Sequence, residues 1–186
     1  SPLPPAPAGA DPDELFESFS QWAQSNGTAL YPAQEEALIE LVSGANVILA
    51  TPTGSGKSLV ATGALYAALA AGRRSFYTAP IKALSNQKFR DYCKLLGEDK
   101  VGLVTGDLVI RRDAPCKVMT TEILRNMLYP QATGEEGTDP TSAGATIGEL
   151  GGVSDGRLDD VGVVVLDEVH YLSDASRGTV WEETII

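Results

Sequence analysis

Cysteine, histidine and positive charge are all scarce in this chain. Its 186 residues include two cysteines and one histidine, and 14 lysines and arginines stand against 25 acidic residues, for a net charge of −11. Cys93 and Cys116 are isolated and lack the spacing of metal ligands. They therefore indicate two reduced thiols and do not support a zinc site.

Long apolar runs are also missing. No segment approaches the roughly 20 apolar residues needed to cross a bilayer, and the opening SPLPPAPAGA has neither the basic residue nor the apolar core of a signal peptide. We therefore expect a cytoplasmic protein with no membrane segment. At 43% hydrophobic content, the 186 residues can form one domain with a full core but not two of normal size.

The charges are unevenly distributed along the chain. Residues 73–117 hold ten of the fourteen lysines and arginines and only five acids, whereas the segments on both sides are acidic. A strongly acidic protein ordinarily does not bind nucleic acid, but a segment with this contrast can still present a basic face. Scattered, solvated charge explains the same pattern equally well, and the sequence leaves both interpretations open.

Helical patterns and short apolar runs alternate along most of the chain. Strands separated by helices require a parallel sheet with right-handed crossovers. We therefore predict a doubly wound, mostly parallel α/β sheet of the P-loop type, with short N-terminal helices and the functional site at the carboxyl ends of the strands. Helices are expected at about 12–26, 32–42, 57–71, 81–96 and 121–129, and strands at 46–50, 75–78, 101–105, 117–120 and 161–166.

Two segments lie outside this alternation. Residues 1–10 are rich in proline and alanine and are predicted to be a disordered tail before a domain at 11–186. Residues 131–160 are dense in Gly, Ser, Thr, Asp and Glu and nearly lack large apolar side chains. Such a composition cannot offset the entropy of ordering, so we expect a mobile insertion, to which we assign no function.

The stretch NVILATPTGSGKS, residues 46–58, indicates a phosphate-binding loop between a buried strand and a helix. Glycines let main-chain amides curl closely around a triphosphate, and the positive end of the following helix faces the phosphates. Lys57 is expected to reach the β and γ phosphates, and the Ser58 hydroxyl to ligate Mg²⁺. Thr51 replaces the first glycine of the full motif, so an ordinary Gly/Ser loop is the alternative, but the flanking strand and helix favour nucleotide. The predicted nucleotide-binding residues are Thr53, Gly54, Ser55, Gly56, Lys57 and Ser58.

A second buried strand, VGVVVL, ends directly before the sequence DEVH at 167–170. Asp167 is expected to hold Mg²⁺ together with Ser58, and Glu168 to orient and deprotonate the attacking water. An Asp-Glu pair at a strand end is more commonly a solvated turn, but its position downstream of the Lys57 loop makes the pair specific. On its own, His170 would more commonly be a structural hydrogen-bonding residue.

At DEVH the chain resembles the first RecA-like domain of superfamily 2 helicases of the DExH-box class. The resemblance covers about residues 30–186, and the later motifs are closest to the superkiller branch, which includes exosome-linked RNA helicases and actinobacterial relatives. The residues that resemble motifs I, Ia, Ib, Ic and II are TPTGSGKS at 51–58, TAPIKALSNQK at 78–88, TGD at 105–107, MTTEILRNMLY at 119–129 and DEVH at 167–170, with RGTVWEE following at 177–183.

The resemblance implies further site residues. Gln34 would read adenine through its amide, with Tyr31 or Pro32 against the base, although a plain helix-start glutamine is the alternative. His170 would couple the nucleotide state to a second domain. Without the resemblance, Lys82 would be interpreted as a solvated lysine, and the threonines as helix caps. The resemblance instead implies that seven residues contact the phosphates and sugars of a single strand. They are Pro80, Lys82, Ala83, Thr105, Gly106, Thr121 and Glu122.

The implied activity is that of an ATP-dependent helicase that uses Mg²⁺ and acts on single-stranded RNA. Such enzymes need a second RecA-like domain in cis with arginine fingers, which this sequence does not contain, so we expect the chain alone to be a monomer that binds ATP without unwinding. The alternatives are a DNA helicase of the same branch and a non-catalytic module for nucleotide or partner binding. A P-loop kinase is least favoured, because Glu168 and His170 would have no task in it.

Overall fold

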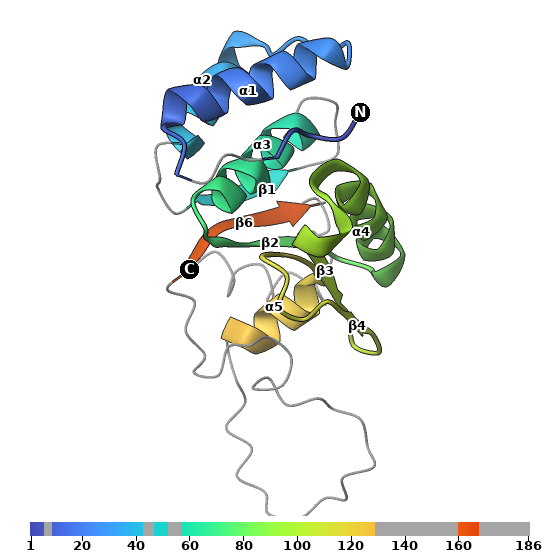
Figure 1. Cartoon of the computed structure of the whole chain (residues 1–186). Helices are drawn as coiled ribbons and strands as arrows, with labels where there is room; N and C mark the ends of the chain where they lie inside the picture. The colour runs from blue at the N-terminus through green and yellow to red at the C-terminus, as the bar shows by residue number, and fades with distance from the viewer. Residues whose placement is uncertain (6–8, 43–46, 52–56, 129–159, 168–186) are drawn as a thin grey trace, which may run out of the picture.

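The computed structural model describes residues 1–5, 9–42, 47–51, 57–128 and 160–167 (Figure 1). Its centre is a six-stranded sheet in which five neighbouring strands run parallel and one edge strand is antiparallel. The predicted doubly wound, mostly parallel α/β fold is therefore confirmed. Across the sheet the strands are β1 (Val47–Thr51), β6 (Val161–Asp167), β2 (Arg74–Ala79), β5 (Cys116–Thr120), β3 (Val101–Val104) and β4 (Val109–Ile110).

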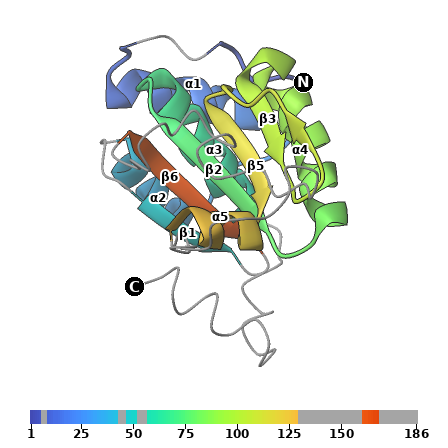
Figure 2. The same cartoon turned by 90° about the horizontal axis from the view of Figure 1, so that it is seen from below.

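Helices cover both faces of the sheet. On one face α3 contacts β1, β2 and β6, and α4 contacts β2, β3 and β5, while α5 lies on the opposite face against β2 and β5. Helices α1 and α2 form an outer layer over α3 (Figures 1 and 2). The bounds are α1 (Pro12–Ser25), α2 (Pro32–Val42), α3 (Lys57–Ala70), α4 (Lys82–Leu96) and α5 (Thr121–Leu128), with a short 3-10 helix at Glu98–Lys100.

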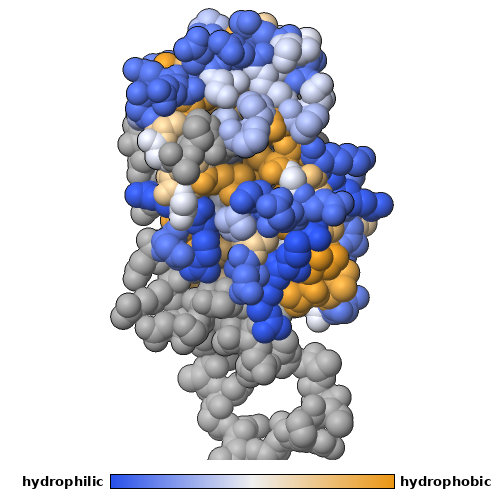
Figure 3. Space-filling view, in the orientation of Figure 1, coloured by the Kyte–Doolittle hydropathy of each residue, from blue (hydrophilic) through white to orange (hydrophobic). Residues whose placement is uncertain are grey.

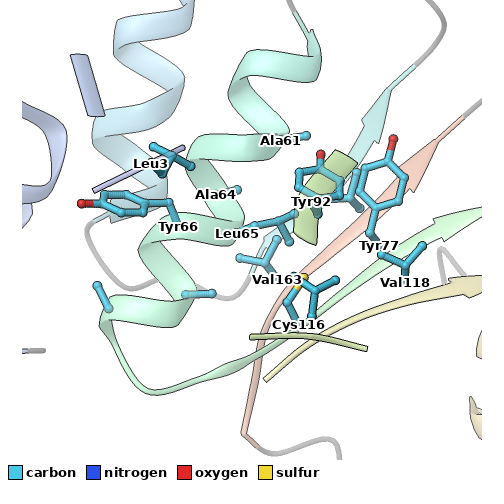
Figure 4. Close-up of a cluster of buried hydrophobic side chains, with 14 of the residues drawn as sticks. Leu3, Ala61, Ala64, Leu65, Tyr66, Tyr77, Tyr92, Cys116, Val118 and Val163 are labelled. Carbon is cyan, nitrogen blue, oxygen red and sulfur yellow. The ribbon is translucent and has the colours of Figure 1, made fainter. Parts of the chain in front are cut away.

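Two apolar clusters form the core, one on each face of the sheet. Neighbouring strand residues alternate between them, because successive side chains of a strand point to opposite faces. Tyr77 and Val163 belong to the cluster under α3 and α4 (Figure 4), whereas Phe76 and Leu166 belong to the cluster under α5. Strands β2, β3, β5 and β6 are thus buried on both faces, as is typical of a parallel sheet that is covered by helices on both sides.

Local sequence signals set the ends of α1. The Asp11 carboxylate accepts a 2.9 Å hydrogen bond from the Glu14 amide, and proline occupies the first helical position. Both features are typical of a helix start, since they satisfy or remove amides that have no partner within the helix. The chain leaves the helix through Gly27, whose φ of 77° is in the left-handed region that glycine adopts without strain.

The edge strand β4 was not predicted from the sequence. It folds back antiparallel onto β3, pairing Val104 with Val109, and two residues are too few to show a strand pattern. Gly102 of β3 permits this close approach, because a Cβ there would lie 2.5 Å from the carbonyl oxygen of Arg111. In Figure 3 an apolar surface area coincides with the position of β4 in Figure 1, where Leu108 is 46% exposed.

The start of the chain differs from the expected disordered tail. The Leu3 side chain is buried in the core cluster under α3 and α4, and its amide donates a 2.8 Å hydrogen bond to the Leu95 carbonyl oxygen. Leu3 is the one large apolar side chain of SPLPPAPAGA, and its burial gives residues 1–5 a position against α4. Of the expected insertion, only Asp160 is among the described residues.

None of the helices in the described ranges has the length and apolarity to cross a membrane.

Candidate nucleotide and nucleic-acid site

Strands β1 and β6 end side by side at the carboxyl edge of the sheet. Thr51, the last residue of β1, is the register partner of Asp167, the last residue of β6, and neighbouring strands lie about 4.8 Å apart. Five residues after Thr51 separate it from the start of α3 at Lys57. The predicted phosphate-binding segment therefore begins beside the predicted metal ligand. The predicted residues Thr53, Gly54, Ser55, Gly56, Glu168 and His170 lie outside the described residues.

Asp167 is a buried residue that is 8% exposed. Its Oδ2 accepts a hydrogen bond of 2.5 Å from the hydroxyl of Tyr77, on the neighbouring strand β2. Tyr77 is the register partner of Val165, and Asp167 follows Val165 by two residues, so both side chains are on the face covered by α3 and α4. A buried carboxylate is costly without such a donor, so this hydrogen bond stabilises it in place.

The first turn of α3 lies on the same face of the sheet. Ser58 is exposed there, and its carbonyl oxygen accepts a 2.8 Å hydrogen bond from the Thr62 hydroxyl one turn later. The side chain of Lys57 lies outside the described residues. The structure thus brings the beginning of the predicted lysine and serine helix and the Asp167 carboxylate to one edge and one face of the sheet.

The donor set at this edge fits Mg²⁺. That ion prefers oxygen ligands and is commonly held by one or two carboxylates together with substrate phosphates. Ser58 and Asp167 supply a hydroxyl and a carboxylate, and no cluster of three or more His, Cys, Asp or Glu side chains occurs in the described ranges. A site of this kind leaves coordination positions for phosphate and water, and does not resemble a closed structural metal site.

A second buried tyrosine packs against Tyr77. Tyr92 comes from α4, and the two ring centroids are 5.2 Å apart with both hydroxyls pointing the same way (Figure 4). Burial raises the pKa of Tyr92 well above its ordinary value, and a hydrogen bond with the Thr62 side chain only partly opposes this shift. Tyr92 is therefore neutral at physiological pH. The sequence showed both tyrosines only as members of an apolar strand and a helix, so their position near Asp167 was not predicted.

Gln34 caps the start of α2. Its Oε1 accepts a 2.9 Å hydrogen bond from the amide of Tyr31, the residue before the helix. A glutamine at the third helical position that reaches back in this way satisfies an amide at the helix start. This contact is the one expected for the alternative interpretation, in which Gln34 only caps the helix start. The neighbouring Tyr31 is 70% exposed. Adenine recognition by Gln34 stays a prediction.

The predicted nucleic-acid residues follow three neighbouring strands. Pro80, Lys82 and Ala83 lie at the junction of β2 and α4, Thr105 and Gly106 follow β3, and Thr121 and Glu122 begin α5 directly after β5. The strand order β1-β6-β2-β5-β3 places these junctions next to the ends of β1 and β6, on the same edge of the sheet (Figure 2).

An ion pair joins two of these junctions. The Lys82 ammonium lies 3.1 Å from Oδ1 of Asp107, and both side chains are more than half exposed. Hydrogen bonds from Lys82 and then from Thr105 hold the pKa of Asp107 below its usual range. The loop after β3 and the start of α4 are thus connected through side chains that remain accessible to solvent.

The two threonines point inward. The Thr105 hydroxyl lies 3.0 Å from Oδ1 of Asp107 and 3.3 Å from the Leu108 carbonyl oxygen, within its own turn. The Thr121 hydroxyl is buried and has no hydrogen-bond partner among the described residues. Gly106 and Glu122 are exposed. These observations favour a structural role for the Thr105 side chain and leave the exposed backbone and Lys82 as the accessible groups.

Several basic residues of the segment 73–117 have structural contacts. Arg74 makes two hydrogen bonds to the Asp160 carboxylate at the amino edge of the sheet. The Arg111 Nε donates a 2.8 Å hydrogen bond to the Val101 carbonyl oxygen. Lys117 is 2% exposed, and burial, followed by the nearby charge of Arg74, lowers its pKa. This part of the segment therefore stabilises the fold and does not form a continuous basic face.

Comparison with known proteins identifies the family of this chain. Residues 31–186 match the model of the DEAD/DEAH box helicase family. The chain belongs to this family. The match begins within one residue of the expected start at about residue 30, and it includes the paired strand ends at Thr51 and Asp167.

The relatives of this helicase domain include members of the predicted superkiller branch. It is 49% identical over 154 residues to the DExH-box ATP-dependent RNA helicase DExH15, chloroplastic, of Arabidopsis thaliana, covering 82% of this chain and 12% of that protein. It is 43% identical over 153 residues to the probable helicase HelY of Mycobacterium tuberculosis, covering 82% and 14%. It is 43% identical over 153 residues to the antiviral helicase SKI2 of Saccharomyces cerevisiae, covering 82% and 10%. The domain thus spans about an eighth of the length of these relatives.

Proposed function

We propose that this helicase domain binds Mg-ATP and that the full-length protein couples ATP hydrolysis to translocation along RNA and to its unwinding. The observation that carries the proposal is the register pairing of Thr51 with Asp167. It supports a single site in which the segment before Lys57 and the sequence DEVH meet a triphosphate from two adjacent strand ends.

Each residue of this site has a proposed role. The Lys57 ammonium binds the β and γ phosphates, and the Ser58 hydroxyl and Asp167 carboxylate hold the metal ion. A bound Mg²⁺ would supply positive charge that neutralises the triphosphate. Glu168 orients the attacking water and accepts its proton, and His170 couples the nucleotide state to a second domain. Catalysis of this type depends mainly on positioning and charge stabilisation.

We further propose that single-stranded RNA crosses the junctions after β2, β3 and β5. Exposed backbone at Ala83 and Gly106, together with the Lys82 ammonium, can meet phosphates without reading bases. The Arabidopsis relative DExH15 is named an ATP-dependent RNA helicase, which supports RNA over DNA. Stimulation of the full-length ATPase by matched single-stranded RNA and DNA tests this choice, and equal stimulation contradicts a preference for RNA.

The domain alone is proposed to bind ATP as a monomer without unwinding. A second RecA-like domain in cis would supply the arginine fingers, and the absence of such a finger lowers phosphoryl-transfer rates by about 10³–10⁵ in GTPases. We expect a cytoplasmic protein, although the name of DExH15 includes the word chloroplastic. Unwinding by these 186 residues alone would contradict the requirement for two domains.

Direct nucleotide binding tests the proposed site. Lys57→Ala is expected to abolish binding of a fluorescent, non-hydrolysable ATP analogue to the full-length protein, because the lysine neutralises the phosphates. Lys100→Ala is the matched control, since Lys100 is exposed in the short 3-10 helix directly before β3, at the amino edge of the sheet. Unchanged binding by Lys57→Ala, measured by fluorescence anisotropy, would show that the phosphates bind elsewhere.

A further inference from the structure

The hydrogen bond between Tyr77 and Asp167 connects the proposed metal site to the core. The tyrosine hydroxyl lies 2.5 Å from Oδ2 of the carboxylate, and both residues are buried, at 3% and 8% exposure. Each carboxylate oxygen can accept more than one hydrogen bond. One oxygen of Asp167 is thus engaged by the protein, and the resemblance to helicases assigned no role to this tyrosine.

The sheet register determines where the tyrosine hydroxyl lies. Tyr77 is opposite Val165 on the adjacent strand, and a parallel sheet advances about 3.3 Å per residue. Asp167 is therefore displaced by about 6.6 Å along the strand, on the same face. A tyrosine side chain that leans toward the carboxyl edge spans this displacement, whereas a shorter hydroxyl side chain at residue 77 would not.

Packing holds the Tyr77 ring in position. The Tyr92 ring from α4 is 5.2 Å away between centroids (Figure 4), and the Lys88 ammonium, also from α4, lies 6.0 Å from the centroid of the Tyr77 ring. The ring also belongs to the core cluster under α3 and α4. Because the ring is fixed, its hydroxyl points in one direction. It can therefore hold the carboxylate that it binds in one orientation.

We propose that Tyr77 is a positioning residue of the metal site, whose hydroxyl holds Oδ2 of Asp167 so that the other carboxylate oxygen faces Mg²⁺. This inference depends on the proposed function, because it requires Asp167 to bind the metal ion. Partners that orient a metal ligand typically contribute 10- to 100-fold to metal affinity or activity. Tyr77 itself contacts neither nucleotide nor metal in this proposal.

Tyr77→Phe in the full-length protein tests the inference, because phenylalanine keeps the packed ring and removes only the hydroxyl. The measured quantity is the affinity for a fluorescent, non-hydrolysable ATP analogue, in EDTA and across a Mg²⁺ titration. We expect affinity in EDTA to stay at the wild-type value. The Mg²⁺ concentration that gives half of the Mg²⁺-dependent gain should rise about 10- to 100-fold.

Tyr66→Phe is the matched control. Tyr66 is another buried tyrosine of the same core cluster, and its hydroxyl is 3.1 Å from the Ser18 hydroxyl, in contact with α1 and away from Asp167. Its Mg²⁺ titration should match the wild type. An equal rise in both variants would assign the effect to the loss of any buried hydroxyl and overturn the inference, as would a wild-type titration for Tyr77→Phe.

Combining Tyr77→Phe with Asp167→Asn provides a second test, which does not depend on Tyr77→Phe alone. If Tyr77 acts through the carboxylate, adding Tyr77→Phe to Asp167→Asn should produce no further change in the Mg²⁺ titration. An additive change would overturn the inference. If the wild-type protein shows no Mg²⁺-dependent gain at all, or if Lys57→Ala leaves binding intact, the proposed nucleotide site itself is wrong, and the inference fails with it.

Discussion

The two halves of the carboxyl edge of the sheet are built differently. Where β1 and β6 end, the Asp167 carboxylate is buried and accepts a hydrogen bond from a packed tyrosine. Where β2 and β3 end, Lys82 and Asp107 form an ion pair between side chains that are 57% and 70% exposed. Moving the buried carboxylate leaves polar groups unpaired, whereas the exposed ion pair can exchange for another partner at little cost.

This difference fits the two proposed ligands. Mg²⁺ requires near-ideal octahedral geometry, so its protein ligands need fixed orientations. A nucleic-acid strand that is bound without regard to sequence needs only phosphate contacts, which replaceable surface charges and exposed amides provide. We therefore expect changes in the first half to alter turnover by orders of magnitude, and changes in the second half to alter RNA affinity by small factors.

Glu168→Gln should have the largest effect. We expect ATP binding to be retained and turnover by the full-length enzyme to fall by about 10²–10⁴, because the general base is lost. Steady-state ATPase rates and binding of the ATP analogue are the measurements, and Glu98→Gln, at an exposed glutamate of the short 3-10 helix, is the control. ATP hydrolysis at the native rate would mean that Glu168 is not the base.

Lys82→Ala should have an intermediate effect, confined to RNA. Loss of one phosphate contact reduces the salt dependence of binding by about one unit of slope, which is up to about tenfold in affinity at 0.1 M salt. ATP affinity should not change. Salt titrations of RNA affinity compare this variant with Lys100→Ala. An unchanged slope would remove Lys82 from the proposed strand path and weaken the contrast between the two halves.

Asp107→Asn should act in the opposite direction and more weakly. Asparagine keeps the oxygen next to the Thr105 hydroxyl but removes the charge paired with Lys82. The released lysine should bind RNA about two- to fivefold more tightly, which matches the small free energy of an exposed ion pair. RNA affinity measured in Lys82→Ala should be insensitive to Asp107→Asn. Weaker RNA binding by Asp107→Asn would show that its charge supports the site.

The ion pair also has a defined pH dependence. The pKa of Asp107 is lowered by Lys82 and Thr105, so the folded state favours the ionised carboxylate. Its contribution to stability is present above the ordinary pKa and is lost as the pH falls through the lowered value. Between pH 6 and 8 the effect of Asp107→Asn on RNA affinity should therefore be constant. A change over this range would point to another titrating group.

Asp160→Asn should have the smallest effect, because it lies at the opposite edge of the sheet. The substitution weakens the bidentate hydrogen bonding between Arg74 and residue 160, whose side chain is 60% exposed in the wild type. We expect a loss of at most about 1 kcal/mol in the free energy of unfolding, measured by urea denaturation, with unchanged ATP and RNA affinities. Changed binding would mean that the amino edge of the sheet also contributes to the site.

The sequence predicted the secondary structure closely wherever the patterns were long. The predicted helix at 32–42 matches α2, and the predicted strand at 161–166 is one residue shorter than β6. These elements have strong local signals: a proline start for the helix, and a continuous apolar run for the strand. Strand β4 was missed because two residues carry no periodic signal. The buried position of Leu3 was missed because a single apolar residue does not indicate a contact 92 residues away at Leu95.

Some residues of the candidate site were predicted from the sequence and others were not. Lys57, Ser58 and Asp167 were named from motifs, because the chemistry of phosphate and Mg²⁺ restricts which residues can follow a strand at these spacings. Tyr77 was not named, because its side chain meets Asp167 only through the pairing of two strands that are 90 residues apart. Likewise, no sequence spacing indicated that Lys82 would pair with Asp107.

By itself, the sequence determined the order of strands and helices, the α/β class and the residues that follow β1 and β6, because these depend on local periodicity and on motif chemistry. Only the tertiary structure decided which strands are neighbours, and hence that Thr51 lies beside Asp167, that Tyr77 reaches the carboxylate, and that Lys82 meets Asp107. Strand order in a parallel sheet is set by how helices pack across its faces. That packing is a property of the whole chain and leaves no local mark in the sequence.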